Sequence, residues 1–179
     1  MWQLATAMAE IALRRRGPDS LPESGFLVFF LLAVHILLTL AVTAALIGGL
    51  TTELLLRFAA DIALFFAFVY AILSFFRLER RYRQTVSAML GADIFINLAF
   101  LPAGLAGIAL GFDILEFPFA WVSLAFQLWS IFIAASILAR SLSQPLIVGF
   151  MLEILLVLTS INIGQLIAPP VEQAAVGSV

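Results

Sequence analysis

Five long apolar runs, separated by short polar connections, constrain the fold of this chain more than any other feature. The runs cover about residues 26–47, 54–76, 86–110, 119–139 and 146–167. An α-helix rises about 1.5 Å per residue, so about 20 apolar residues cross a hydrocarbon core about 30 Å thick. The sequence therefore predicts an all-α, polytopic transmembrane helical bundle of about five spans, within a domain that covers residues 20–170.

The composition agrees with a membrane protein and excludes several classes of soluble protein. Of the 179 residues, 64% are hydrophobic and 11% are charged, whereas a soluble domain carries about 25% charged residues. The absence of cysteine and the single histidine exclude disulfides, thiolate metal sites and histidine metal clusters. Serine-nucleophile, phosphate-loop and zinc-helix motifs are also absent from the sequence. We therefore expect no enzyme activity, no metal or cofactor and no nucleic-acid partner.

The segment that precedes the first span, residues 1–19, has a helical pattern of its own. Leu4, Met8 and Ile11 fall on one helical face, and three arginines follow. Because the run is too short to cross a bilayer, we predict a short amphipathic helix at the cytoplasmic membrane interface. The alternative is a surface segment that only helps to set the orientation. After the fifth span, residues 171–179 are expected to form a flexible external tail.

The placement of arginine predicts the orientation of the spans. All nine basic residues are arginine, a bias that indicates GC-rich codons and hence a bacterial source. Cytoplasmic flanks of membrane spans collect positive charge. With the N-terminus inside the cell, eight of the nine fall on the cytoplasmic side, namely Arg14, Arg15, Arg16, Arg77, Arg80, Arg81, Arg83 and Arg140. We therefore expect a bacterial inner-membrane protein with a cytoplasmic N-terminus and an external, periplasmic C-terminus.

Polar side chains within the apolar runs are the candidates for function, because a charge at bilayer depth costs about 2.5–3.5 kcal/mol on insertion scales. The candidate polar site consists of His35, Asp93, Asn97, Gln127 and Glu153. Asp93 and Glu153 lie at similar depths in the predicted topology, so they could share a proton and form a proton path or a cation site. The alternative is that each carboxyl is protonated, hydrogen bonds to Asn97, Gln127 or a backbone carbonyl, and only holds helices together.

A second pair of charges, Arg57 and Asp61, lies in the second span. Opposite charges four residues apart on a helix attract each other, so we predict an ion pair that lowers the cost of insertion. The sequence around Asp61 also matches that around Asp93, because Ala-Asp-Ile is followed at the same offset by Ala-Phe in both 60–68 and 92–100. Consecutive spans run in opposite directions, so this is the relation expected of an inverted repeat, although such matches also arise by chance in so apolar a chain.

Three glycines near the end of the third span, Gly104, Gly107 and Gly111, form a group of small residues. Small residues let neighbouring helices approach closely within a membrane. We therefore predict that this segment packs against another helix, either in the same protein, in a second copy or in a partner.

Two polar stretches flank the first and third spans: Arg16-Gly17-Pro18-Asp19-Ser20-Leu21-Pro22, and Gln84-Thr85-Val86-Ser87-Ala88 after an arginine-rich turn. Together with the outline of residues 20–170, they make the chain resemble the Yip1-domain membrane proteins. The resemblance implies five closely spaced helices after a polar cytoplasmic N-terminus. It also implies a role in trafficking or membrane shaping through partner proteins, without catalytic residues.

Two functions fit these observations. The first is a non-catalytic accessory or organising component of a membrane complex or of the bilayer, with lipids and other membrane proteins or a second copy as partners. The second is a small transporter, or a proton- or cation-conducting protein, that uses the intramembrane carboxylates Asp93 and Glu153. A lipid-acting enzyme would depend on the arginine cluster around Glu79 and ranks third. Convergence of the polar groups on a cavity would favour the second function over the first.

Overall fold

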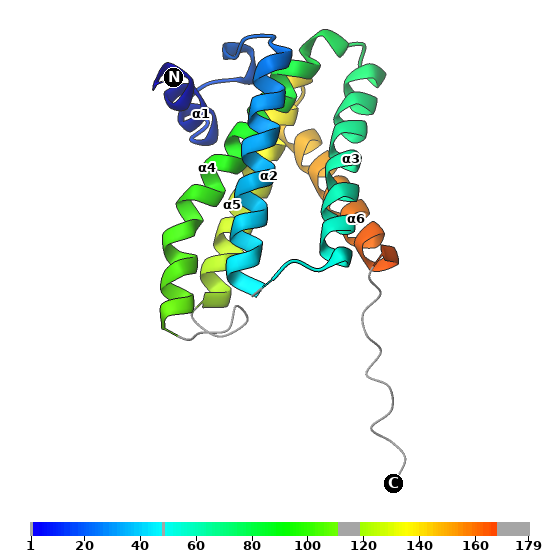
Figure 1. The fold of residues 1–179 in the computed structure, drawn as a ribbon. Helices are drawn as coiled ribbons and strands as arrows, with labels where there is room; N and C mark the ends of the chain where they lie inside the picture. Colours follow the sequence, from blue (N-terminus) through cyan, green and yellow to red (C-terminus); the bar gives the residue numbers. More distant parts are fainter. Residues whose placement is uncertain (1, 48, 111–118, 168–179) are drawn as a thin grey trace.

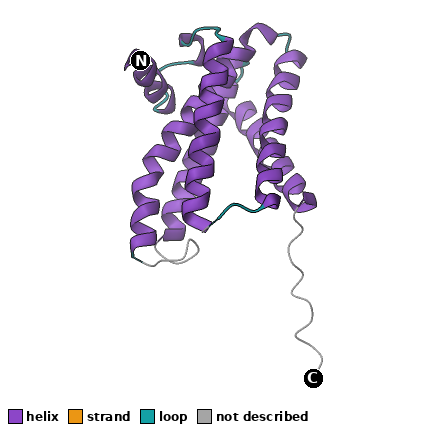
Figure 2. Ribbon diagram, viewed as in Figure 1, coloured by secondary structure: helices purple, strands orange, loops and turns teal. Residues whose placement is uncertain are grey.

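The structure, a computed structural model, describes residues 2–47, 49–110 and 119–167. Within these ranges the chain consists of helices and short connections, without a strand, which confirms the all-α class (Figure 2). The helices follow in the order α1 (Trp2–Ala12), η1 (Pro18–Ser20), α2 (Gly25–Ile47), α3 (Thr52–Phe75), η2 (Glu79–Arg81), α4 (Tyr82–Ala109), α5 (Phe119–Ser141) and α6 (Leu146–Ile167). Figure 1 shows the long helices side by side in one bundle.

Five of the described helices, α2 to α6, are long and apolar enough to cross a membrane. Each begins and ends within about one helical turn of a span predicted from the sequence. Large apolar side chains on their surfaces are exposed, for example Phe26, Phe75 and Leu166. Soluble proteins rarely expose so much contiguous apolar surface, because water does not solvate it favourably. The chain is therefore an integral membrane protein.

Helix α4 is the central helix of the bundle. It packs against α1, α2, α3 and α5. Near its start, Thr85, Val86 and Ser87 are completely buried. Leu73 of α3 and Leu138 of α5 belong to the same hydrophobic core as Val86. The best-packed part of the protein therefore surrounds the first half of α4.

One end of the bundle, called here the arginine end, carries α1, the connection between α3 and α4, and the connection between α5 and α6 (Figure 1). The eight arginines that the sequence assigns to one side of the membrane lie in or beside these segments. Because α1 and both of these connections lie at the same end, the chain crosses the bundle an odd number of times between α1 and the end of α6.

Helices α1, α3 and α5 end at the arginine end with the same backbone conformation. Arg14, Arg77 and Ser143 have positive φ angles of 60°, 58° and 54°. In each case the next amide donates to a carbonyl five residues back, in the pairs Arg15 N to Glu10 O, Leu78 N to Leu73 O and Gln144 N to Ala139 O. A left-handed residue followed by such a bond is a standard helix stop, usually with glycine at that position. The connections at this end are therefore tight turns of defined geometry.

The N-terminal helix α1 lies against α4 (Figure 1). Ala7, Ile11 and Ala12 are buried there, and Met8 is close enough to Gly91 that an added Cβ would lie 3.0 Å from its side chain. This segment is thus a helix that packs on protein, whereas its amphipathic character is an expectation from the sequence. Its placement at a membrane interface stays a prediction.

Glycines allow two close approaches between the long helices. At Gly149, an added Cβ would collide with the backbone carbonyl of Ala135, so α5 and α6 touch there through their backbones. At Gly107, an added Cβ would lie 2.7 Å from the ring of Phe119. Gly104 is also buried, whereas the predicted packing residue Gly111 lies outside the described residues. The position of Gly107 is therefore filled by α5 of the same chain.

Candidate functional site

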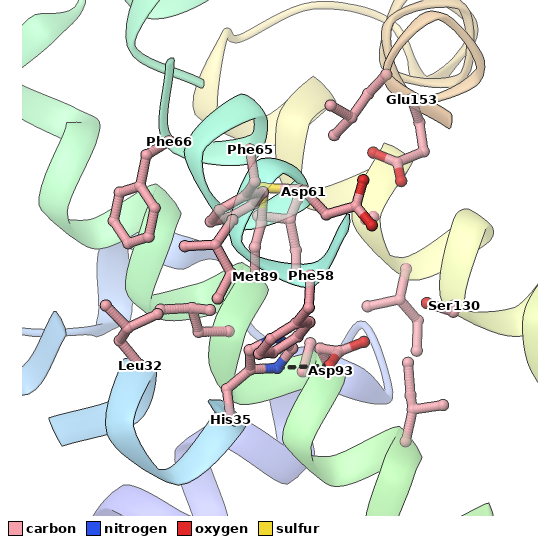
Figure 3. Close-up of a pocket in the computed structure, with 18 residues that line it drawn as sticks. Leu32, His35, Phe58, Asp61, Phe65, Phe66, Met89, Asp93, Ser130 and Glu153 are labelled. Atoms are coloured by element: carbon pink, nitrogen blue, oxygen red, sulfur yellow. Dashed lines mark ion pairs between the residues drawn. The ribbon is translucent and has the colours of Figure 1, made fainter. Parts of the chain in front are cut away.

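A cavity of about 230 Å³ lies between α2, α3, α4, α5 and α6. Its polar side chains are His35, Asp61, Asp93, Ser130 and Glu153. Its other walls are aliphatic and aromatic, and include Phe58, Phe65, Phe66 and Met89. In Figure 3 the carboxylates of Asp61, Asp93 and Glu153 reach from three helices toward the same space. The cavity is therefore the candidate functional site.

Asp93 of α4 is held by two neighbours. The Nδ1 atom of His35, on α2, lies 2.9 Å from Asp93 Oδ2, and the two groups form an ion pair when the imidazole is protonated (Figure 3). Asn97 Nδ2 donates to the same oxygen at 2.8 Å and to the Asp93 backbone oxygen at 3.0 Å. The ring of His35 also stacks on Phe58, with 6.0 Å between the ring centroids. These contacts fix the orientation of the Asp93 carboxylate.

Asp61 of α3 has a partner on α6, since Ser160 Oγ donates to Asp61 Oδ1 at 2.6 Å. The predicted ion pair between Arg57 and Asp61 is wrong for the part of the chain that the structure describes, where the two pairs are Glu10 with Arg16 and His35 with Asp93. The guanidinium of Arg57 instead lies against Gly164, where an added Cβ would be 2.6 Å from Nε. The packing of α3 on α6 therefore determines what Asp61 and Arg57 each contact, and spacing along α3 alone does not predict it.

Glu153 of α6 is the most enclosed of the acidic side chains at the cavity, with 7% of the residue exposed. Its Oε2 atom is buried and has no hydrogen-bond partner within the described residues. An unpaired polar atom in such a place is costly, by about 1–3 kcal/mol for a neutral group and more for a charge. Glu153 is therefore a group that a ligand or a proton would stabilise.

One face of α6 carries the residues that build its side of the site. Gly149, Glu153, Leu156, Ser160 and Gly164 are spaced by three or four residues, so they share a face. Glu153 and Leu156 line the cavity, while Ser160 binds Asp61. The close contact at Gly149 brings this face against α5 and buries Glu153 beside it.

The sequence predicted part of this site. His35, Asp93 and Glu153 line the cavity, and Asn97 binds Asp93. Gln127 is exposed on α5 and does not line the cavity, so its inclusion was wrong.

Sequence reasoning did not include Asp61, Ser130 or Ser160 in the candidate polar site. One signal pointed to Asp61, since the short internal match aligns it with Asp93, and both aspartates line the same cavity. Serines in apolar helices are too common to be selected without the fold.

The acidic side chains are spread around the cavity. Among the described residues, His, Asp and Glu side chains form no group of three that could hold one metal ion. The site combines three carboxylates and one imidazole, and no arginine is among its lining residues. Its charge therefore favours protons or a cation whose atoms span several of these groups.

A second cavity, of about 240 Å³, lies at the arginine end and is lined by Arg81, Arg140, Asp19 and several hydroxyl side chains. Arg81 Nη1 donates to Ser141 O at 2.8 Å and to Ser143 Oγ at 3.0 Å, which joins the start of α4 to the end of α5. Arg140 donates to the backbone oxygens of Arg16 and Arg14, at 2.7 and 2.9 Å. These arginines therefore fasten α1, α4 and α5 to one another.

No protein-family model, curated protein or solved structure matches this chain. The fold and the site define an integral membrane protein with an acidic cavity between its spans. The resemblance to Yip1-domain proteins stays a prediction from the sequence.

Proposed function

We propose that this protein is a small transporter, or a proton- or cation-conducting protein, that uses the carboxylates of its intramembrane cavity. Asp93 and Glu153 are the central groups, and Asp61 and His35 complete the site. The observation that carries the proposal is the convergence of these side chains, from different helices, on one cavity of about 230 Å³. A role limited to organising a complex would not require such a convergence.

The charge balance of the cavity supports the proposal. A protonated His35 would neutralise Asp93, which leaves Asp61 and Glu153 without a basic partner among the lining residues. Each unpaired charge at bilayer depth costs about 2.5–3.5 kcal/mol on insertion scales. Binding of a proton or a cation removes that cost. The unpaired carboxylates are therefore stabilised most by a positively charged species, such as a proton or a cation, that can bind and leave again.

The distribution of hydrogen bonds separates a binding role from a packing role. Polar side chains that only hold membrane helices together pair between helices, as Asp61 of α3 does with Ser160 of α6 and Asp93 of α4 with His35 of α2. Glu153 Oε2 is buried without such a partner in the described part of the chain. We therefore assign Glu153 as the group that takes up and releases the proton or cation, and Asp93 as the group that sets its electrostatic environment.

The proposed topology follows from the arginine end. We place this end in the cytoplasm, because cytoplasmic flanks collect positive charge, and the C-terminal tail outside. The membrane would be the inner membrane of a bacterium. Helix α1 would lie at the cytoplasmic interface, with one face packed on α4 and the other toward the lipid headgroups. Lipids are the expected partners, and the proposal includes no catalytic step.

Charge displacement after a rapid pH change, recorded on solid-supported membranes that carry the purified protein, tests the proposal. Wild-type protein is expected to give a transient current because protons enter the cavity, and Glu153→Gln is expected to lose it. Glu23→Gln is the matched control, since Glu23 is an exposed carboxylate before α2. Wild-type currents equal to those of protein-free membranes, or unchanged currents in both Glu153→Gln and Asp93→Asn, would contradict the proposal.

A further inference from the structure

The walls of the cavity differ in chemistry from one side to the other. In Figure 3, Leu32, Phe65, Phe66 and Met89 lie on one side, while the oxygens of the three carboxylates point toward the other. A fully hydrated inorganic ion would place water against the apolar side. A molecule with a hydrocarbon part and a polar head would match both sides.

The charge and spacing of the acidic groups define the head of such a molecule. Asp61, Asp93 and Glu153 repel anions, and the lining residues include no arginine that would bind one. In the described ranges no three acidic or histidine side chains are grouped tightly enough to hold one metal ion, so a cation with several hydrogen-bond donors suits these separated groups better than a bare metal ion does. An ammonium group meets this condition, because it carries a positive charge and several N–H donors.

The aromatic side chains define the rest of the molecule. Phe58 and Phe65 line the cavity beside Asp61, which lies on the same helix. Aromatic faces attract cations and also pack against hydrocarbon rings. The cavity volume of about 230 Å³ exceeds the roughly 150 Å³ that accepts benzene in an engineered apolar cavity. One ring with a short amine chain is therefore a suitable size.

We infer that the cavity binds a small lipophilic amine, with one hydrocarbon ring and one ammonium group, as the cation of the proposed transport cycle. The inference rests on the proposed function. The ammonium group donates to the unpartnered Glu153 Oε2 and to a carboxylate oxygen of Asp61, while the ring lies against Phe58 and Phe65. The groups that face Glu153 across the cavity are Asp61, Asp93 and His35, and the only arginine within α3, Arg57, packs on Gly164 instead.

Exchange of the amine for a proton follows from the same site. When Glu153 is protonated, its carboxyl group is neutral and attracts the ammonium group less. Entry of the amine therefore displaces one proton from the cavity to solvent, and the total charge in the site is unchanged. Amine and proton thus compete for Glu153, which is the relation that a proton-coupled exchanger requires.

Isothermal titration of the purified full-length protein with 2-phenylethylamine tests the inference, with empty detergent micelles as the blank. We expect saturable binding that releases about one proton, measured by comparing buffers of different ionisation enthalpy. Two analogues are expected to bind at least about tenfold more weakly. The neutral 2-phenylethanol lacks the ammonium group, and the cation methylammonium lacks the ring. Equal binding of the amine and the alcohol would overturn the inference, as would amine heats equal to the blank.

Variants add a second readout. Glu153→Gln is expected to weaken amine binding by about tenfold or more and to abolish proton release, and Phe65→Ala to weaken binding while proton release per bound amine is kept. Glu23→Gln should behave as the wild type. The comparison of amine with alcohol needs no variant, so it decides the case even if Glu153→Gln does not fold. Wild-type currents after a pH jump without amine binding would reject the amine alone, whereas loss of both would reject the proposed function as well.

Discussion

His35 Nδ1 lies 2.9 Å from Asp93 Oδ2, so the only histidine of the sequence joins α2 to α4 beside the cavity. Removal of one member of a charged pair inside a protein leaves the other uncompensated. We expect His35→Phe to lower the free energy of unfolding by about 1–3 kcal/mol. The double variant with Asp93→Asn should recover much of this loss. Chemical unfolding in detergent measures the coupling, and additive effects of the two changes would contradict the pairing.

Close packing of α5 and α6 predicts a strong effect at Gly149. An alanine side chain there would meet the carbonyl oxygen of Ala135, and the backbone cannot move aside easily. We expect Gly149→Ala to cost about 1–3 kcal/mol of stability, as overpacking does elsewhere. Gly25→Ala is the control, because an added Cβ at Gly25 meets nothing within 4 Å. Similar unfolding midpoints for the two variants would show that the helices do not touch at Gly149.

Docking of α1 depends on Arg140, which donates to the backbone oxygens of Arg14 and Arg16 at the end of that helix. We expect Arg140→Gln to increase hydrogen exchange of the α1 amides at least several-fold, because local opening becomes easier when its hydrogen bonds are removed. Arg83→Gln removes the same charge from an exposed position at the same end of the bundle. Equal exchange of α1 in both variants would mean that charge, and not these two bonds, holds the helix.

The partner of Asp61 can be tested by two substitutions on different helices. Ser160→Ala removes the hydroxyl that donates to Asp61 Oδ1 and should cost about 1 kcal/mol of stability. Arg57→Gln should cost less than Ser160→Ala, because within the described residues the guanidinium of Arg57 has no acidic partner and only packs on Gly164. Thermal unfolding of the purified variants measures both. A larger loss of stability for Arg57→Gln than for Ser160→Ala would instead support the ion pair between Arg57 and Asp61 that helical spacing predicts.

The orientation of the bundle is accessible to labelling, because the natural sequence contains no cysteine. Single substitutions Arg83→Cys, at the arginine end, and Ser178→Cys, in the C-terminal tail, provide unique targets. A membrane-impermeant maleimide added to intact cells should label the tail, and should label position 83 only after the membrane is opened. The reverse pattern would place the arginine end outside the cell.

The sequence was sufficient for the spans because their length is set by the bilayer. Each apolar run long enough to cross the hydrocarbon core has to form a helix, since only a helix satisfies every backbone group within a single segment. Agreement in the positions of α2 to α6 follows from this constraint. The docking of α1 was not predictable in the same way, because an apolar helical face fits a protein surface as well as it fits lipid.

The candidate site was less predictable, since its geometry depends on contacts between helices. Asp93 and Glu153 were found because carboxylates in apolar runs are rare and costly. The partner of Asp61 lies on α6, 99 residues away, and a spacing rule within one helix cannot find it. Gln127 was misplaced for a similar reason, since periodicity does not show which face of α5 meets the bundle.

The shared face of α6 has a mechanical consequence. Four functions of α6 lie along this one face. Gly149 contacts the backbone of α5, Glu153 lines the cavity, Ser160 donates to Asp61, and Gly164 leaves room for the guanidinium of Arg57. A rotation of α6 by one residue, about 100°, would carry all of them away from the bundle together. Such a turn of α6 would break its contacts with α3 and α5 together and move Glu153 away from the cavity, so the packing of this one face also sets the position of the acid.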